Sequence, residues 1–207
     1  MQPDMTLRII RPADRWQFSR SLMEMHHHRK QVFVDQLGWK LVGGGWLEVD
    51  EFDNDFATYL MVVSPDDDRH LASVRLLPTT RPHMLSSVFA DLVPDGAPQG
   101  ETVWEISRFI AAPGEGGASV LRVHRMLAHA LVEFALLNGV ERYTLITESR
   151  RLPALLSIGW TVMPLSLPVV KDGELIEALE ILIDARSVEA VARRPGPPAG
   201  DGVRSAA

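Results

Sequence analysis

The chain has 207 residues, of which 46% are hydrophobic and 23% charged, and it contains no cysteine. This composition is typical of one folded domain, and the lack of cysteine excludes disulfides, thiolate metal sites and a thiol nucleophile. The formal net charge of -6 argues against a general nucleic-acid-binding protein, which needs a basic face. No run approaches the roughly 20 apolar residues that span a bilayer, and the N-terminus lacks a signal-peptide layout. We therefore expect a cytoplasmic protein without a membrane span.

The first quarter of the chain predicts a strand, a helix and a long loop. Residues 7–10 are apolar enough for a strand, and residues 14–36 are compatible with a helix. Its inward stripe is expected to consist of Trp16, Leu22, Met23, Val32 and Phe33. Gly38 and the glycines at 43–45 then interrupt regular structure, so residues 39–55 are predicted to form a loop. Loops of this length in a compact domain usually carry function.

The rest of the chain predicts alternating strands and helices. Strands are expected at residues 57–63 and 71–77 (a hairpin), 103–111, 143–147, around 169, and 178–183. Helices are expected at about 85–92, 120–137 (ending at Asn138-Gly139) and 152–158. This order indicates a mixed α/β (α+β) sandwich. We expect a single domain over residues 1–192 and a disordered tail over residues 193–207, which has no apolar periodicity.

The strand over residues 103–111 contains charged side chains where packing alone would not place them. Strict alternation puts Trp104, Ile106 and Arg108 on one face and Glu105, Ser107 and Phe109 on the other. A carboxylate and a guanidinium in a central strand are costly to bury unless they are paired or line a site. A plain buried ion pair, or an edge strand with one wet face, is the alternative explanation.

Three other polar runs in the sequence can be explained either as functional sites or as ordinary surface or turn residues. The acidic run Glu48–Asp53 is either a site, a solvated turn or a cation site, although its spacing does not match an EF-hand. His26, His27 and His28 point about 100° apart on a helix, so they do not converge on one ion. The glycine-rich turn over residues 114–118 precedes a helix and is either a phosphate site or an ordinary strand–helix turn. We predict no bound metal.

Five fragments occur in order between residues 29 and 109. They are Arg29-x-x-x-Phe33, Leu37-Gly38-Trp39, Asp50-Glu51-Phe52-Asp53, Arg75-Leu76-Leu77-Pro78-Thr79-Thr80-x-Pro82-x-Met84-Leu85 and Trp104-Glu105-x-Ser107-Arg108-Phe109. In order and spacing they resemble the signature of the LuxI-type autoinducer synthases, which make acyl-homoserine lactones.

This resemblance implies a GNAT-like acyltransferase fold, a twisted sheet flanked by helices. It also implies two substrates and no prosthetic group: S-adenosyl-L-methionine, and an acyl thioester carried by acyl carrier protein or coenzyme A. The amine of the first would be acylated and the product closed to a lactone, releasing methylthioadenosine. The residues that the resemblance places in the site are Arg29, Phe33, Trp39, Asp50, Asp53, Arg75, Glu105 and Arg108.

The chemistry gives these residue types plausible roles. Acylation needs a neutral amine, so a carboxylate must accept a proton, and Glu105 is the candidate. Lactonisation needs an oriented carboxylate, which suits a guanidinium fork; Arg29, Arg75 and Arg108 are available. Phe33 and Trp39 suit the adenine or the sulfonium. Asp50 and Asp53 suit the ammonium or the arginines.

The acyl pocket is expected in the C-terminal half. Its candidate lining residues are Ser107, Met126, Phe134, Leu145, Thr147, Leu155 and Trp160. Each apolar candidate taken separately is better explained as core, whereas the hydroxyls of Ser107 and Thr147 could favour an oxygen substituent at the acyl C3. Two other functions remain open: a general GNAT N-acyltransferase acting on another amine, and a catalytically silent acyl-thioester-binding module. The sequence leaves undefined the acyl chain, the choice of carrier protein or coenzyme A, the oligomeric state and the separate roles of the arginines.

Overall fold

The computed structural model describes residues 5–39 and 45–193 of the chain. The described part divides into two compact units. One runs through Arg75 and resumes over Arg108–Ala130, and the other comprises Leu76–Ser107 and the residues from Leu131 onward. The expected tail lies outside the described residues except for Arg193, which ends a helix.

The first unit is built around strands β1 (Thr6–Ile10) and β2 (Thr58–Val63), together with parts of β3 (His70–Pro78) and β4 (Val103–Ala111). Its strand order is β1-β2-β3-β4, and β1 pairs antiparallel with β2, with Thr6 opposite Val63. Every residue of β2 is buried, as in a strand that is covered on both faces. The predicted hairpin is confirmed: Ser64 N–H donates to the Arg69 carbonyl at 2.9 Å between β2 and β3.

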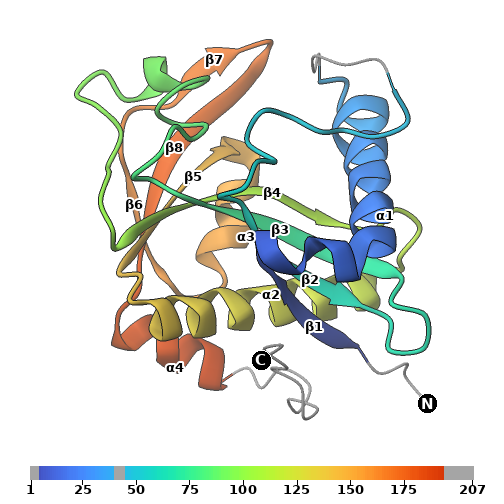
Figure 1. The fold of residues 1–207 in the computed structure, drawn as a ribbon. Coiled ribbons are helices and arrows are strands. Elements are labelled where there is room, and N and C mark those ends of the chain that lie inside the picture. The colour runs from blue at the N-terminus through green and yellow to red at the C-terminus, as the bar shows by residue number, and fades with distance from the viewer. Residues whose placement is uncertain (1–4, 40–44, 194–207) are drawn as a thin grey trace. The chain divides into compact units, whose positions relative to one another are not determined.

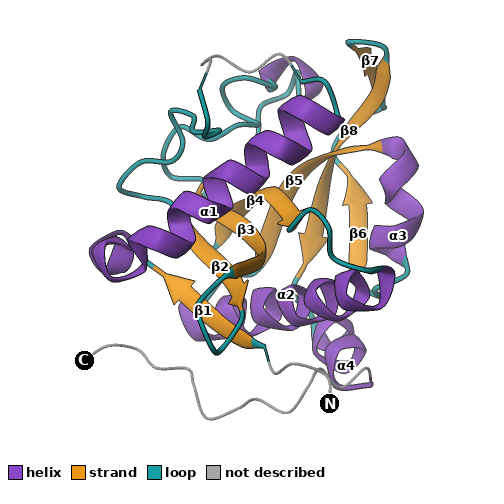
Figure 2. Cartoon of the chain, turned by 90° about the vertical axis from the view of Figure 1, so that its right-hand side faces the viewer, coloured by secondary structure: helices purple, strands orange, loops and turns teal. Residues whose placement is uncertain are grey.

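The helix predicted over residues 14–36 is a continuous helical segment that consists of three successive helix types. It begins with the 3-10 helix η1 (Pro12–Phe18), continues as α1 (Ser19–Arg29) and ends in the π-helix η2 (Lys30–Gln36). Helix α1 lies over β3 in Figure 2. The Ser21 Oγ donates to the carbonyl of Asp68, just before β3, and the His70 N–H donates to Glu24 of α1. Its buried residues are Ser21, Leu22, Met25 and Arg29, spaced along one helical face.

The predicted apolar stripe of this helix was partly wrong. Leu22 and Phe33 are buried, but Trp16 and Met23 are 75% and 61% exposed. Met23 lies about 100° around the helix from Leu22, so both cannot face the same side. Trp16 belongs to the 3-10 segment, whose tighter winding does not continue the phase of α1.

The second unit contains the rest of the sheet. From β4 the strand order continues to β5 (Arg142–Glu148), β8 (Glu174–Leu182) and β6 (Thr161–Pro164), and β7 (Val169–Lys171) pairs with β8 (Figure 1). Strand β4 is parallel to β5, whereas β5 and β8 are antiparallel. Helix α2 (Gly117–Asn138) contributes its C-terminal part, from Leu131 onward, to this unit. The unit also holds α3 (Leu152–Leu156), α4 (Ala185–Arg193) and the 3-10 turns η3 (Ala90–Leu92) and η4 (Ser149–Arg151).

The second unit packs apolar groups on both faces of its strands. On one face, Tyr143 Oη donates to the Leu131 carbonyl of α2 at 2.9 Å, and the Trp104 and Phe134 rings meet edge to face at 5.3 Å. On the other, Leu85, Leu92 and Val93 form a buried cluster with Ala178 of β8. The sequence did not predict β6 or α4, and residues 85–92 form turns with a short 3-10 segment in place of the expected helix. None of the helices in the described ranges is long and apolar enough to cross a bilayer.

Candidate active site

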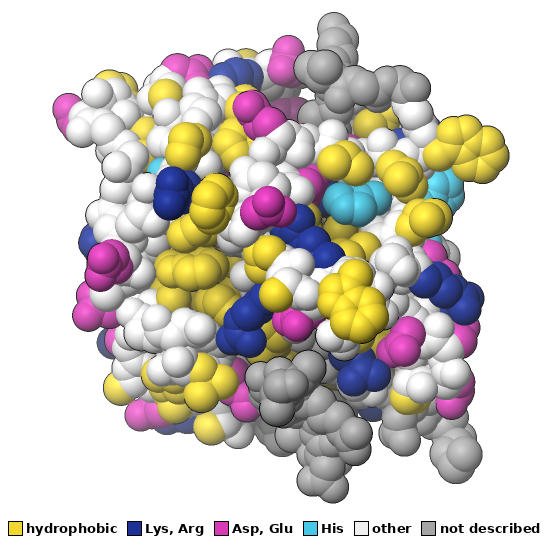
Figure 3. Space-filling view, in the orientation of Figure 1, with side chains coloured by type: hydrophobic (Ala, Val, Ile, Leu, Met, Phe, Trp, Pro, Cys, Tyr) yellow, Lys and Arg dark blue, Asp and Glu magenta, His cyan; other side chains and the backbone are white. Residues whose placement is uncertain are grey.

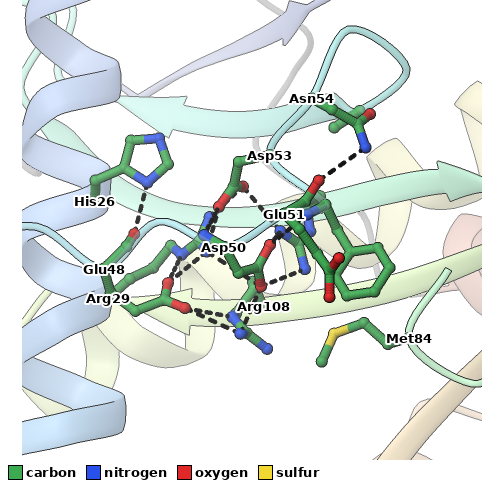
Figure 4. A network of polar contacts seen from close by, with 12 residues as sticks. His26, Arg29, Glu48, Asp50, Glu51, Asp53, Asn54, Met84 and Arg108 are labelled. Atoms are coloured by element: carbon green, nitrogen blue, oxygen red, sulfur yellow. Dashed lines mark hydrogen bonds and ion pairs between the residues drawn. The ribbon is translucent and has the colours of Figure 1, made fainter. Parts of the chain in front are cut away.

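Six charged side chains of the first unit form one network, here called the ion cluster (Figure 4). Its members are Arg29 of α1, Glu48, Asp50 and Asp53 of the loop before β2, Arg75 of β3 and Arg108 of β4. Three guanidinium groups meet three carboxylates, so the formal charges balance. Five of the eight residues that the resemblance placed in the site are thus brought together with Glu48. They are Arg29, Asp50, Asp53, Arg75 and Arg108.

Arg29 and Arg75 are held by the two aspartates. The Arg29 Nη1 and Nη2 atoms donate to the two oxygens of Asp53 at 2.8 and 2.9 Å, and its Nε donates to Glu48. Arg75 Nη2 donates to Asp50 at 3.0 Å, and its Nη1 lies 2.9 Å from Asp53. Paired guanidinium–carboxylate bonds of this kind fix orientation as well as charge.

Arg108 joins the cluster from β4. Its Nε and Nη2 atoms donate to Glu48 Oε1 at 3.1 and 2.9 Å, and Nη2 also donates to Asp50 at 2.6 Å. The backbone of Arg108 has φ +53, a left-handed conformation that is uncommon for a non-glycine residue.

This conformation breaks the alternation that the sequence predicted for β4. Trp104 contacts Phe134 of α2, and Phe109 contacts His124 of the same helix. Strict alternation would have sent Trp104 and Phe109 to opposite faces. The prediction that even-numbered and odd-numbered side chains of β4 point to opposite faces was therefore wrong beyond Ser107. A residue with positive φ interrupts the alternation, so the side chains after it no longer follow the same order.

Phe33 and Trp39 form an aromatic pair beside the cluster. Gly38 has φ +69 at the end of η2, and the Trp39 N–H bonds back to the Phe33 carbonyl at 2.9 Å. The two rings therefore stack, with centroids 4.7 Å apart and planes 23° apart. The guanidinium carbon of Arg108 lies 5.3 Å from the Phe33 ring centre and 6.0 Å from that of Trp39. Phe33 is buried, whereas Trp39 is 37% exposed.

Burial and mutual pairing set the electrostatics of the cluster. Burial by itself raises the pKa of Asp53, but Arg29 and Arg75 outweigh it and hold that pKa well below its usual range. The pKa of Arg29 is raised by Asp53 and Glu48 despite the opposing effect of burial. Burial lowers the pKa of Arg108, against the influence of Glu48 and Asp50. Asp53 and the arginines are therefore charged at neutral pH.

Asp50 differs from the other members in its access to solvent. Its side chain is 20% exposed, whereas the side chains of the other five are at most 4% exposed. A cationic group arriving from outside can therefore reach the Asp50 carboxylate more readily than it can reach Asp53. Asp53 is further occupied by the Tyr59 hydroxyl, which donates to it at 2.8 Å.

Glu105 lies in the second unit and is fully buried. Its two carboxylate oxygens accept the backbone N–H groups of Met84 and Leu85 at 2.9 and 2.7 Å. In the β4–β5 register Glu105 is paired with Thr144, whose buried hydroxyl has no hydrogen-bond partner among the described residues.

The predicted acyl-pocket residues are distributed over several elements. Met126 is in the part of α2 that belongs to the first unit, and the other six are in the second. Phe134 and Trp160 are buried, whereas Ser107, Leu145, Thr147 and Leu155 are partly exposed. Thr147 is paired with Glu177 of β8, so it is Thr144 and not Thr147 that neighbours Glu105. Their role in an acyl pocket stays a prediction.

Two residues of the first unit were missed by sequence reasoning as site members. Glu48 links Arg29 to Arg108, and its place in the acidic run was the only signal available. Tyr59 lies at the start of β2 and binds Asp53 through its hydroxyl, which nothing in the local sequence indicates.

The electrostatics predict a stability loss in acid. The pKa of Asp53 is lower in the folded protein than in the unfolded chain, so its stabilising contribution is present above about pH 4 and decreases as the pH falls. We expect Asp53→Asn to lower the free energy of unfolding at pH 7 by about 3–5 kcal/mol and to flatten its pH dependence below pH 4. Urea unfolding between pH 7 and pH 3 measures both effects.

Asp35→Asn is the matched control, because Asp35 pairs with Lys30 on the surface, where such pairs contribute about 0–1 kcal/mol. Equal stability of the Asp53→Asn and Asp35→Asn proteins would show that the ion cluster does not stabilise the fold.

Comparison with known proteins places the chain in a family. A model of the autoinducer synthases matches residues 16–191. An acyl-homoserine-lactone synthase of Ralstonia nicotianae is 43% identical over 129 residues, which are 58% of this chain and 62% of that protein. An isovaleryl-homoserine lactone synthase of Bradyrhizobium diazoefficiens is 31% identical over 181 residues, covering 86% of this chain and 80% of that protein. The chain thus spans about three fifths of the Ralstonia relative.

Comparison with solved structures supports the same family. The coenzyme-A-dependent acyl-homoserine lactone synthase BjaI, solved with S-adenosylmethionine (SAM) and isopentyl-CoA, matches with a TM-score of 0.85 and 27% identity, covering 94% of this chain and 91% of that one. A putative N-acetyltransferase from Lactobacillus plantarum, at 19% identity and a TM-score of 0.57, shares the fold alone. The predicted GNAT-like acyltransferase fold is therefore confirmed, and the chain belongs to the autoinducer synthase family.

Proposed function

We propose that this protein is an acyl-homoserine-lactone synthase that acylates the amine of S-adenosyl-L-methionine and closes the product to a lactone. The observation that carries the proposal is the charge-balanced ion cluster beside the Phe33–Trp39 pair, in a chain of the autoinducer synthase family. The proposal is further supported by BjaI, a relative solved with SAM and isopentyl-CoA.

The ion cluster and the aromatic pair suit S-adenosylmethionine, which carries a sulfonium, an ammonium and a carboxylate. The partly exposed Asp50 carboxylate attracts the ammonium, and the exposed face of Trp39 suits the sulfonium or the adenine through cation–π or stacking contacts. The buried Asp53 acts indirectly by holding Arg29 and Arg75. In this assignment the cluster orients the substrate and takes no part in covalent chemistry.

Acyl transfer forms a bond between the methionyl nitrogen and the thioester carbonyl carbon and breaks the carbon–sulfur bond to the carrier. The ammonium must lose a proton first, and Glu105 accepts it directly or through a water molecule. The backbone bonds from Met84 and Leu85 fix the position of the Glu105 carboxylate for this task. The carrier thiolate leaves with the electron pair of the broken bond and takes up a proton.

Lactonisation follows within the acylated intermediate. An oxygen of the methionyl carboxylate attacks the γ-carbon, and the carbon–sulfur bond to the sulfonium breaks, releasing neutral methylthioadenosine. This step requires orientation of the carboxylate and no external base. The arginines are the protein groups with the right charge for that orientation, although their guanidinium groups also bind Glu48, Asp50 and Asp53.

The acyl donor is a thioester of coenzyme A or of acyl carrier protein. BjaI is described as coenzyme-A-dependent, and the Bradyrhizobium relative is named an isovaleryl-homoserine lactone synthase, so branched short acyl-CoA compounds are the first donors to test. Synthesis in the cytoplasm belongs to the proposal, because both substrates are products of central metabolism.

The reaction is tested by mass spectrometry of the purified protein incubated with SAM and a panel of acyl thioesters on both carriers. We expect an acyl-homoserine lactone and methylthioadenosine in equal amounts with at least one donor. If no donor yields a lactone while another amine becomes acylated, the protein is a general N-acyltransferase.

Glu105→Gln tests the proton acceptor. We expect turnover to fall about 100-fold or more, with the affinity for SAM changed less than about threefold, because general-base catalysis contributes about 10²–10⁴-fold to a rate. Gln also loses one acceptor for the Met84 or Leu85 N–H, so calorimetric binding of SAM must be measured on the same sample to show that the protein is folded. Turnover near the wild-type rate would exclude Glu105 as the base.

Trp39→Ala tests the aromatic contact. Since Trp39 is partly exposed, we expect little loss of stability but a roughly 5- to 30-fold rise in KM for SAM, whereas Trp39→Phe should retain most of the affinity. Trp16→Ala is the control, because Trp16 is 75% exposed and lies in η1. Equal KM values in the Trp39→Ala and Trp16→Ala proteins would remove Trp39 from the site.

A further inference from the structure

The three carboxylates of the ion cluster lie on a loop without helix or strand. Glu48, Asp50 and Asp53 fall within six consecutive residues. Repeating hydrogen bonds of a helix or a sheet do not fix this backbone, so side chains from other elements must hold it. The structure identifies those side chains within the first unit.

His26 of α1 binds the backbone of Glu48 at two points. Its Nδ1 atom lies 2.8 Å from the Glu48 carbonyl oxygen, and the Glu48 N–H donates to the His26 carbonyl at 3.0 Å (Figure 4). A carbonyl oxygen only accepts, so Nδ1 of His26 carries the hydrogen. Burial, with Arg29 nearby, lowers the pKa of His26, which favours the neutral ring with this tautomer.

His27 binds the same loop two residues earlier. Its Nδ1 lies 3.0 Å from the Trp46 carbonyl oxygen, and its Nε2 lies 3.2 Å from the Gln31 Nε2 amide nitrogen. The two contacts require one tautomer: Nδ1 donates to the carbonyl and Nε2 accepts from the Gln31 amide. Gln31 therefore keeps the His27 ring oriented towards the loop.

The far end of the loop is held separately. Arg15 donates to the carbonyls of Asn54 and Ala57 at 2.5 and 2.8 Å, and the Tyr59 hydroxyl binds the Asp53 side chain. The acidic loop, residues 46–57, is thus fixed at Trp46 and Glu48 by the two histidines, and from Asp53 onward by Tyr59 and Arg15. The carboxylates between these two anchors have little freedom to shift relative to the arginines.

We propose that His26 and His27 are positioning residues for the SAM site, which they order by binding the backbone of the acidic loop at Glu48 and Trp46. This inference rests on the function proposed above. His26 binds the backbone of the residue whose carboxylate joins Arg29 to Arg108, so a displacement of Glu48 moves the cluster as a whole. The neighbouring Asp50 then loses its alignment with the substrate ammonium.

The next histidine provides an internal control. His28 points to β3, where its Nδ1 lies 2.8 Å from Nδ1 of His70. His26 and His27 are partly exposed, and histidine side chains reach the surface in the region of α1 in Figure 3. Substituting either of them therefore removes a hydrogen bond without opening a large cavity in the core.

The experiment compares His26→Ala, His26→Asn, His27→Ala and His28→Asn in the full chain. The Asn amide nitrogen can occupy the place of Nδ1 and donate to the same carbonyl. Hydrogen–deuterium exchange of peptides covering residues 46–53 reports on the loop without any assumption about activity. Steady-state kinetics give KM for SAM, KM for the acyl thioester and kcat.

We expect the loop amides to exchange faster in His26→Ala and His27→Ala, and to exchange as in the wild type in His26→Asn and His28→Asn. KM for SAM should rise about three- to tenfold in the two alanine variants, as for one lost hydrogen bond, with kcat and KM for the thioester nearly unchanged. His28→Asn should lower the melting temperature without altering KM.

Unchanged loop exchange in His26→Ala would overturn the proposal, and so would an equal rise of KM for SAM in His26→Ala and His28→Asn. If the wild type makes no lactone, the proposed function fails. The exchange experiment, with the melting-temperature shift caused by added SAM in each variant, then still decides whether the histidines order the loop and its binding site.

Discussion

The mutual neutralisation of three arginines and three carboxylates in a nearly dry space is the constraint on which the first unit depends. A buried charge without a partner costs several kcal/mol. Removing any one member of the ion cluster would therefore leave the opposite charge of its partner buried and unpaired. Arg29 comes from α1, Arg75 from β3 and Arg108 from β4, and the loop supplies every carboxylate. The positions of two strands and one helix within this unit are therefore tied to the conformation of one loop.

That loop has little structure of its own and is ordered by side chains of other elements. His26 and His27 bind its carbonyls on one side, and Arg15 binds them on the other. Its internal bonds are short-range: the Asp50 N–H donates to Asp53, and the Phe52 N–H donates to Asp50. Such an arrangement preorganises the charges, so that a substrate bound at the proposed site would meet a fixed electrostatic field.

Two carboxylates of the proposed site, Asp53 and Glu105, lie in different environments. Asp53 is surrounded by guanidinium groups and a tyrosine hydroxyl, which keep it ionised and occupied. Glu105 accepts two neutral backbone N–H groups, and it is paired in the sheet with a threonine whose hydroxyl has no partner among the described residues. Glu105 is held by neutral amides rather than by guanidinium groups, and on this difference we propose acid–base chemistry for Glu105 and an orienting role for Asp53.

The sequence alone determined the family, most of the strands and the α2 helix ending at Asn138-Gly139, since motif order and local periodicity carry that information. It also grouped Arg29, Asp50, Asp53, Arg75 and Arg108, which the structure brings together in one ion cluster. Tertiary structure decided what spacing cannot encode. The positive φ of Arg108 overturned the predicted faces of β4, and the π-helical end of the first helical run, with Gly38, set Trp39 on Phe33. Glu48 and the histidines acquire their roles from residues 19 to 60 positions away, and such long-range pairing leaves no local periodic signal.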